Sequence, residues 1–126
     1  MVKEFSWCGF TWDQIEKMST EEFIRYIPSR ERRTFRRGLS DAMKKLVKDV
    51  QESKGAIKTH CRDMVVTPLF VGKTISVHSG KEFVPIIIDK DMLGHRLGEF
   101  ALTRRRVAHS APGIGATRSS ASLSVK

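Results

Sequence analysis

The first half of the chain places its apolar residues at the spacing of helices. Ser19 followed by Glu22 is a capping-box pattern, which predicts that a short helix begins there. Pro28 ends that helix, because the proline ring disfavours the helical conformation in the residue before it. The apolar side of the helix is formed by Phe23, Ile24 and Ile27.

A longer helix is predicted from Ser29, which can cap it, to about Ser53. Its apolar residues form one stripe at the helical period. The stripe consists of Phe35, Leu39, Met43, Leu46, Val47 and Val50. The other faces carry basic side chains, namely Arg30, Arg32, Arg33, Arg36, Arg37, Lys44, Lys45 and Lys48.

From about residue 55 the period changes to that of strands. Segments 74–78 and 81–88 alternate on either side of Ser79-Gly80, which predicts a hairpin with a two-residue turn. The core face of this hairpin holds Ile75, Val77, Val84, Ile86 and Ile88. The opposite face holds Thr74, Ser76, His78, Lys81 and Phe83.

The two-residue turn fixes the pairing of the hairpin strands. It places His78 opposite Lys81 and Ile75 opposite Val84. Pro85 has no N–H to donate to a neighbouring strand, so the second strand is expected at an edge of the sheet or bulged at that point.

Two further segments complete the predicted core. Residues 63–68 are expected to supply a third strand. A short helix opened by Asp89 or Asp91 follows the hairpin. In it, Gly94 and Gly98 allow another backbone to come close, unless Gly98 simply ends the helix. The residues expected to dock it on the sheet are Leu93, Leu97 and Phe100.

These patterns predict an α+β fold, with a small antiparallel sheet of about three strands packed against a short helix. We divide the chain into a helical N-terminal extension (residues 1–54), an α+β core (55–103) and a basic C-terminal tail (104–126). No apolar period survives in the tail, whose small and polar residues are typical of a disordered segment.

The chain is strongly basic, with a net charge of +9 and a pI near 10.0. Residues 1–28 carry −2, residues 29–63 carry +6, residues 64–103 are neutral and residues 104–126 carry +5. Basic segments on both sides of a neutral one indicate a polyanionic partner. A membrane is not expected as partner, because no segment has the length and apolarity of a transmembrane helix and the N-terminus lacks a secretory pattern.

Five arginines lie within residues 30–37, opposed only by Glu31. Most charged helix faces are merely solvated, but this imbalance exceeds what solubility requires. The guanidinium fork suits phosphate oxygens, so we predict a phosphate-binding face. No helix-turn-helix, zinc-finger or basic-zipper pattern is present, and long basic extensions suit folded RNA better than a regular duplex.

Catalytic and metal-ligating patterns are sparse. The four histidines have no metal-ligand spacing, and no nucleophile is paired with a base in the sequence. We therefore expect no enzyme, no metal and no cofactor, and we expect the two cysteines to be reduced thiols. The residues considered were His60, His78, His95, His109, Cys8 and Cys61.

The glycines in "HSAPGIGATRSS" (residues 109–120) have two interpretations, a phosphate-cradling loop or a joint in a flexible tail. A nucleotide loop must follow a strand and open a helix. Gly113 and Gly115 instead follow an arginine run and lead to the C-terminus, and no Gly-Lys-Ser/Thr sequence is present. This context favours a basic segment that orders on contact with nucleic acid.

Residues 72–104 contain a long ordered motif: a turn glycine, a basic residue, an apolar strand, then Met-apolar-Gly-His-basic-Leu-Gly-Glu-Phe and a Thr. The motif residues are Ser79, Gly80, Lys81, Met92, Leu93, Gly94, His95, Arg96, Leu97, Gly98, Glu99, Phe100 and Thr103. This stretch closely resembles the small-subunit ribosomal protein family numbered nineteen in bacteria. Segments 33–39, 58–64 and 112–120 are similar to its archaeal and eukaryotic branch, numbered fifteen in eukaryotic ribosomes.

The resemblance implies a structural constituent of the small ribosomal subunit in the cytoplasm. It implies a place in the head, where the protein binds ribosomal RNA beside the protein of the family numbered thirteen in bacteria. Its C-terminal tail would reach toward the decoding centre and tRNA. No membrane and no small-molecule substrate are expected as partners.

The residues expected to contact RNA combine the motif with the basic segments. In the N-terminal extension, the core and the first three residues of the tail they are Arg30, Arg32, Arg33, Arg36, Arg37, Lys44, Lys58, His60, Arg62, Lys73, His78, Lys81, His95, Arg96, Thr103, Arg104, Arg105 and Arg106. The tail residues expected near tRNA and the decoding centre are His109, Gly113, Gly115, Thr117, Arg118 and Ser119. The alternatives are a free-standing RNA-binding chaperone or regulator and, more remotely, a nucleotide-using enzyme centred on the glycine pair.

Overall fold

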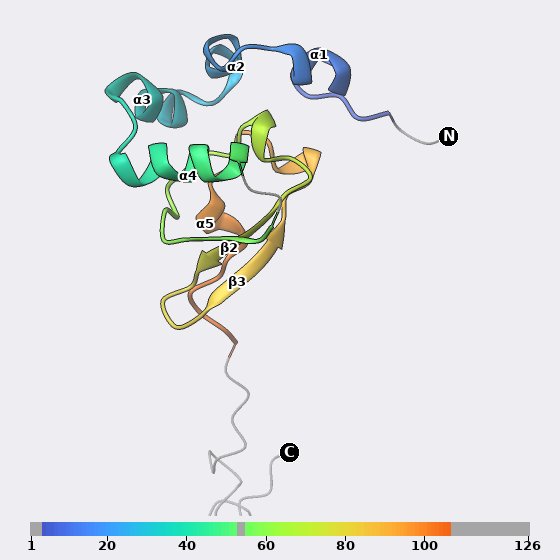
Figure 1. Ribbon diagram of the computed structural model, residues 1–126. Coiled ribbons are helices and arrows are strands. Elements are labelled where there is room, and N and C mark those ends of the chain that lie inside the picture. Colours follow the sequence, from blue (N-terminus) through green and yellow to red (C-terminus); the bar gives the residue numbers. More distant parts are fainter. Residues whose placement is uncertain (1–3, 53–54, 107–126) are drawn as a thin grey trace, which may run out of the picture.

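The computed structural model describes residues 4–52 and 55–106 (Figure 1). Four helices come first, α1 (Trp12–Lys17), α2 (Thr20–Tyr26), α3 (Ser29–Arg37) and α4 (Asp41–Glu52). The strands are β1 (Ile57–Thr59), β2 (Thr74–His78) and β3 (Phe83–Ile87). The short 3-10 helices η1 (Pro68–Phe70) and η2 (Lys90–Met92) and the helix α5 (Leu97–Phe100) complete the described elements. The predicted α+β class, with helices ahead of a three-stranded sheet, is confirmed.

Helix α2 begins and ends where the sequence predicts. The Ser19 hydroxyl accepts a hydrogen bond from the Glu22 N–H at 3.3 Å, and the Glu22 carboxylate accepts one from the Ser19 N–H at 3.1 Å. Both halves of the capping box are therefore formed. The helix ends before Pro28, and Phe23 and Ile27 from its apolar side are buried.

The single helix predicted over residues 29–53 is wrong, because the structure has two helices there. Gly38 ends α3 with a φ of +92°, in the left-handed region that favours glycine. Ser40 then caps α4, since its hydroxyl accepts a hydrogen bond from the Met43 N–H at 3.4 Å. Ser29, the expected cap, is the first helical residue after Pro28. The apolar stripe survives the break: Met43, Leu46 and Val50 are buried, and Phe35, Leu39 and Val47 pack against the core.

The sheet is mixed rather than purely antiparallel. Its strand order is β1-β2-β3, with β1 parallel to β2 and β2 antiparallel to β3. The third strand predicted at residues 63–68 is therefore wrong, since β1 takes that place. Residues 63–68 hydrogen-bond instead to the segment that leads into α5. The Val66 N–H donates to the His95 carbonyl at 2.8 Å, and the Leu97 N–H donates to the Met64 carbonyl at 2.9 Å.

The hairpin register differs from the prediction by two residues. His78 lies opposite Phe83, and Ile75 lies opposite Ile86. The loop has four residues, 79–82, and a 2.8 Å hydrogen bond from its first N–H to its last carbonyl closes it. A shift of two residues leaves every side chain on its predicted face. The core face is therefore confirmed, and Ile75, Val77, Ile86 and Ile88 are buried.

The helix predicted after the hairpin is split into η2 and α5, with Gly94 (φ +79°) between them. Asp89 caps η2 by accepting a hydrogen bond from the Lys90 N–H at 2.7 Å. Gly98 lies within α5, and a Cβ atom on it would lie only 2.9 Å from the Arg62 carbonyl oxygen. The prediction that a glycine here admits another backbone is confirmed, and the alternative that Gly98 ends the helix is wrong.

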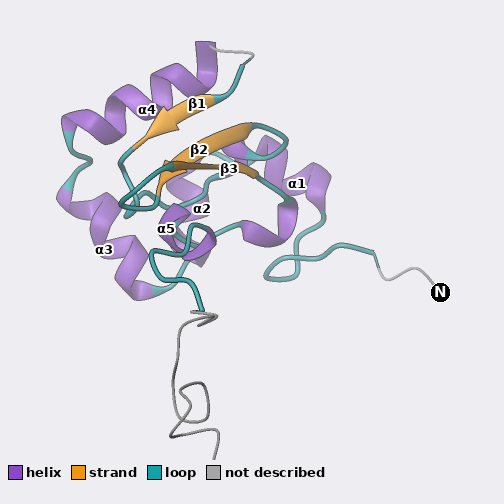
Figure 2. Ribbon diagram, turned by 90° about the horizontal axis from the view of Figure 1, so that it is seen from below, coloured by secondary structure: helices purple, strands orange, loops and turns teal. Residues whose placement is uncertain are grey.

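The helices and one face of the sheet share one core, while the other face of the sheet is open. The three strands lie side by side, with α4 next to β1 (Figure 2). Phe23 of α2, Phe70 of η1 and Leu97 of α5 are fully buried in this core. On the other face, Ile87 is 71% exposed. Strand β3 is an edge strand, as Pro85 requires.

Candidate nucleic-acid interface

The arginines of α3 form an outward-facing basic surface. We call it the arginine face; it consists of Arg30, Arg33, Arg36 and Arg37, all of which are exposed. A hollow of about 400 Å³ lies beside it, and Ser29, Arg32 and three arginines of the face line that hollow. Guanidinium groups pair with phosphate oxygens through two parallel hydrogen bonds, so a hollow walled by arginines suits a phosphate.

Arg32, on the same helix, turns toward the protein. One of its guanidinium nitrogens donates to the carbonyl oxygens of Arg25 at 2.9 Å and of Ile27 at 3.0 Å. These carbonyls lie at the C-terminal end of α2, where a helix has no backbone partners for them. Arg32 therefore joins α2 to α3, and its predicted contact with RNA stays a prediction.

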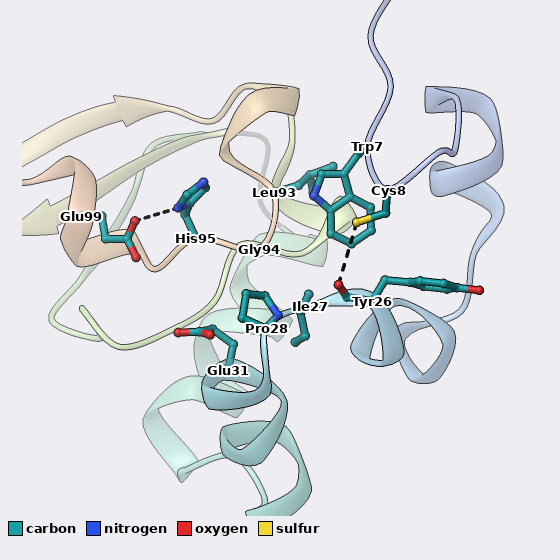
Figure 3. Close-up of a pocket in the computed structure, with 10 residues that line it drawn as sticks. All are labelled: Trp7, Cys8, Tyr26, Ile27, Pro28, Glu31, Leu93, Gly94, His95 and Glu99. Carbon is teal, nitrogen blue, oxygen red and sulfur yellow. Dashed lines mark hydrogen bonds and ion pairs between the residues drawn. The ribbon is translucent and has the colours of Figure 1, made fainter.

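Arg96 and His95, neighbours in the motif, each pair with a carboxylate. The Arg96 guanidinium lies 3.1 Å from the Glu31 carboxylate of α3, and the two side chains are only 24% and 14% exposed. The His95 ring nitrogen Nδ1 lies 2.8 Å from the carboxylate of Glu99, a residue of α5 (Figure 3). The Arg96–Glu31 pair anchors α3 to the loop before α5, and so it fixes the arginine face relative to the core.

Arg62 is bonded to three backbone carbonyls from two segments. Its guanidinium donates to the carbonyl oxygens of His78 at 2.7 Å, Gly98 at 2.9 Å and Ala101 at 2.6 Å. The fork of the guanidinium is what allows one side chain to reach all three. Arg62 therefore holds the end of β2 against α5 and the residue that ends α5.

Two predicted lysine contacts also have protein partners. The Lys73 ammonium donates to the Val50 carbonyl near the C-terminal end of α4. Lys44 lies 3.5 Å from Asp41 in an exposed pair, which contributes little to stability and leaves the ammonium accessible. Lys73 therefore joins α4 to β2, which begins at the next residue. Lys44 stays available to a phosphate.

A second basic surface lies where the β2–β3 hairpin meets the first residues of the tail. We call it the hairpin surface; it consists of Lys58, His60, His78, Lys81, Thr103, Arg104 and Arg106. Arg105 forms an exposed ion pair with Glu82 of the hairpin loop, so the first residues of the tail lie beside the hairpin. All residues of the hairpin surface are exposed except His78, which is half-buried.

The arginine face and the hairpin surface lie at opposite ends of the protein. Figure 1 shows α3 among the helices at one end and the β2–β3 loop at the other, where the chain leaves toward residue 106. The neutral segment between the two basic ones supplies β2, β3 and α5. The exposed arginines of α3 and of residues 104–106 point outward, so the described parts of both basic segments present positive charge to a partner.

Another hollow, of about 410 Å³, is lined by Trp7 and Cys8, by residues 26–28 and by residues 93–95 of the motif (Figure 3). The Cys8 thiol points to the Tyr26 carbonyl at 3.9 Å, whereas the His95 ring is bonded to Glu99. Thiol and imidazole thus have separate structural partners. Over residues 4–52 and 55–106, no three His, Cys, Asp or Glu side chains are placed to hold a metal ion. Cys8 and Cys61 are not bonded to each other.

The tail predictions lie outside the described residues. They concern His109, Gly113, Gly115, Thr117, Arg118 and Ser119. Within the part of the chain that the structure describes, no helix has the length and apolarity to cross a membrane.

A known protein family matches the part of the chain that carries most of the arginine face and all of the hairpin surface. The family model for ribosomal protein S19 matches residues 33–109, more than half of the chain. The match includes three of the four arginines of the arginine face, the whole sheet, the motif and all of the hairpin surface. The chain belongs to the ribosomal protein S19 family. It is therefore a structural protein of the small ribosomal subunit, whose partner is ribosomal RNA.

Membership in the ribosomal protein S19 family confirms the resemblance carried by residues 72–104. It also favours a structural over a catalytic role, in agreement with the separate partners of Cys8 and His95. Residues 1–32, which supply α1, α2 and the start of α3, lie outside the match.

Two residues of this S19-family protein, Glu31 and Phe83, make contacts beside the basic surfaces that the sequence did not predict. Glu31 was counted only as a stray acidic residue among arginines, and nothing local shows that it pairs with Arg96 across the chain. Phe83 was placed on the open face of the hairpin but not among the contacts. The sequence feature that could have indicated a contact at Phe83 is an aromatic residue on an otherwise polar face of the hairpin.

Proposed function

We propose that this chain binds the ribosomal RNA of the small-subunit head through two separate surfaces. The arginine face and the hairpin surface each neutralise backbone phosphates, and the neutral core between them sets the distance and orientation of the two. Phosphate contacts of this kind supply affinity without reading sequence.

The observation that carries the proposal is the outward display of charge at both ends of a neutral body. The arginine face contains four exposed arginines on one helix, and Arg62 holds the end of β2 in the hairpin surface through the His78 carbonyl. The arginine face lies on α3, and residues 58–81 of the hairpin surface lie on the sheet and its adjoining loops. A rigid separation between two phosphate-binding surfaces favours a partner with a fixed fold, as ribosomal RNA has.

The finer assignment concerns the neighbours in the subunit. Segments 33–39, 58–64 and 112–120 support a member of the archaeal and eukaryotic branch. In that branch the tail after Arg106 extends toward the decoding centre and tRNA, and the core lies beside the head protein of the family numbered thirteen in bacteria. The start of such a tail lies at the hairpin surface, where Arg105 pairs with Glu82.

Cosedimentation with small subunits tests the proposal. The variant R36A/R37A removes two positive charges from the last turn of α3, and the control K17A/R25A removes two from the last turns of α1 and α2. All four side chains are exposed, so the two variants differ in location rather than in charge. We expect the wild type and the control to stay on small subunits in a rising salt wash, and R36A/R37A to be released at lower salt.

Two results would contradict the proposal. One is a mostly free pool of the wild-type protein at moderate salt. The other is release of R36A/R37A and K17A/R25A at the same salt concentration, because this would show that total charge, and not the arginine face, holds the protein on the subunit.

A further inference from the structure

Three aromatic rings meet on the open face of the sheet, and we call them the ring platform: His60, His78 and Phe83. The ring centroids of His60 and His78 lie 4.4 Å apart, with their planes tilted by 34°. Phe83 meets both rings edge-on, at 5.1 Å from His60 and 4.9 Å from His78. These are contact distances for aromatic rings, so the three side chains form one cluster.

The sheet register explains why the rings meet. His78 ends β2 directly opposite Phe83, the first residue of β3. Because Thr59, the last residue of β1, pairs with Val77 in parallel, the residue after it, His60, lies level with His78. Successive side chains in strands alternate between faces, and Ile86 and Val77 point to the core. The ring platform therefore crosses all three strands on the face that no helix of the described chain covers.

Hydrogen bonds hold His78 in place on the protein side of the ring platform, and the solvent side of the platform is accessible. The Gly80 N–H donates to Nδ1 of His78 at 3.1 Å, and Arg62 donates to the His78 carbonyl at 2.7 Å. His78 and Phe83 are half-buried, whereas His60, which covers His78, is exposed. An ordered ring array with an accessible top loses little conformational entropy when a flat ligand stacks on it.

The charges around the platform suit a nucleotide. The Lys58 ammonium lies 5.6 Å from the centroid of the Phe83 ring, and exposed Lys81 stands in the adjoining loop. A phosphate alone would be served by lysine without any ring, and a base pair inside a helix offers no free face for stacking. A ring array beside lysines is what binds an unpaired base together with its phosphate.

We propose that the ring platform stacks one unpaired nucleobase of the RNA, with Lys58 and Lys81 on the phosphates beside it. This inference rests on the proposed function and adds to it a contact that depends on base exposure as well as on charge. Single-stranded or bulged RNA is therefore the class of ligand at this surface, while the arginine face accepts any phosphate backbone.

Binding of two RNA forms to the full chain tests the platform. The probe is a 12-nucleotide RNA with 2-aminopurine at its centre, used as a single strand and annealed to its complement. We expect H60A to weaken single-strand binding about tenfold, to leave duplex binding within twofold, and to remove the fluorescence change of 2-aminopurine. F83L should behave like H60A, and H60Y, which restores a ring, should bind like the wild type. K81A should weaken binding of both forms.

The outcomes separate the inference from the function on which it rests. If H60A binds the single strand as tightly as the wild type, or weakens both RNA forms equally, then His60 is not a stacking residue and the inference is overturned. If the wild-type chain binds neither RNA form, the proposed function itself fails, and the inference fails with it. Circular dichroism of H60A and H60Y establishes that both variants keep the wild-type fold.

Discussion

Replacement of Arg62 should destabilise the fold. The sequence predicts that Arg62 contacts RNA, but in the structure its guanidinium bonds three backbone carbonyls of the protein. Replacing it with methionine keeps much of the side-chain bulk and removes the guanidinium. The carbonyl oxygens of His78, Gly98 and Ala101 then lose their common donor. Ala101 is fully buried, so water reaches its carbonyl poorly.

The expected loss is large for a single substitution. A hydrogen bond to a charged group contributes roughly 1.5–3 kcal/mol, and partial exposure of Arg62 lowers this to about 1 kcal/mol for each of its bonds. The free energy of unfolding should therefore fall by about 3 kcal/mol, out of the roughly 5–15 kcal/mol that stabilise a domain of this kind. The midpoint of thermal unfolding should fall by about 10–15 °C.

Chemical and thermal unfolding of the full chain, followed by circular dichroism, measure this loss. The matched control is Arg33→Met on the arginine face, which should change stability by no more than about 0.5 kcal/mol because Arg33 is exposed. Arg62→Lys keeps the charge but lacks the fork, so it should recover only part of the loss. A fall below about 1 kcal/mol for Arg62→Met would refute the structural role.

Three further predictions concern other contacts. Gly98→Ala should destabilise the fold by about 1–3 kcal/mol in urea unfolding, because its Cβ meets the Arg62 carbonyl at 2.9 Å, while Gly55→Ala, with nothing within 4 Å, should be neutral; equal effects would refute the close approach. Glu31→Gln should lower the free energy of unfolding by about 1–3 kcal/mol, because it leaves half-buried Arg96 without its charged partner, and an unchanged urea midpoint would contradict this. Deletion of residues 111–126 should shift the thermal midpoint by less than about 2 °C and weaken tRNA binding to small subunits; unfolding would show that the tail is part of the core.

The sequence predicted those features that depend on neighbours along the chain. The capping box of α2 and the end of that helix before Pro28 are set by residues within one turn of each other. The two faces of the hairpin were correct although its register was not, because alternation has a period of two and the error was two residues.

The features that the sequence did not predict depend on contacts between distant residues. The apolar stripe runs through the break between α3 and α4, so its period gave no sign of the left-handed turn at Gly38. Strand β1 has three residues and gains its place only by pairing with β2, which lies more than a dozen residues further along. A three-residue strand is too short to show a period of its own.

The distribution of charge along the sequence predicted two basic segments, but it did not predict which group each basic side chain contacts. Arg33 and Arg62 are both arginines in the same basic segment, yet only Arg62 finds carbonyl oxygens of its own chain. A count of basic residues cannot separate a guanidinium that bonds a phosphate from one that bonds a backbone carbonyl. The three-dimensional positions of the acceptors decide this.

The salt dependence of binding to a small-subunit ribosomal RNA transcript tests most directly whether two separate surfaces hold the RNA. Each lost phosphate contact should lower the slope of log affinity against log salt by about 0.7–0.9. We expect R36A/R37A and R104A/R106A each to lower the slope by about 1.5, the four substitutions together to lower it by about 3, and K17A/R25A to leave it unchanged. An unchanged slope for either surface, or an equal drop for K17A/R25A, would contradict the account.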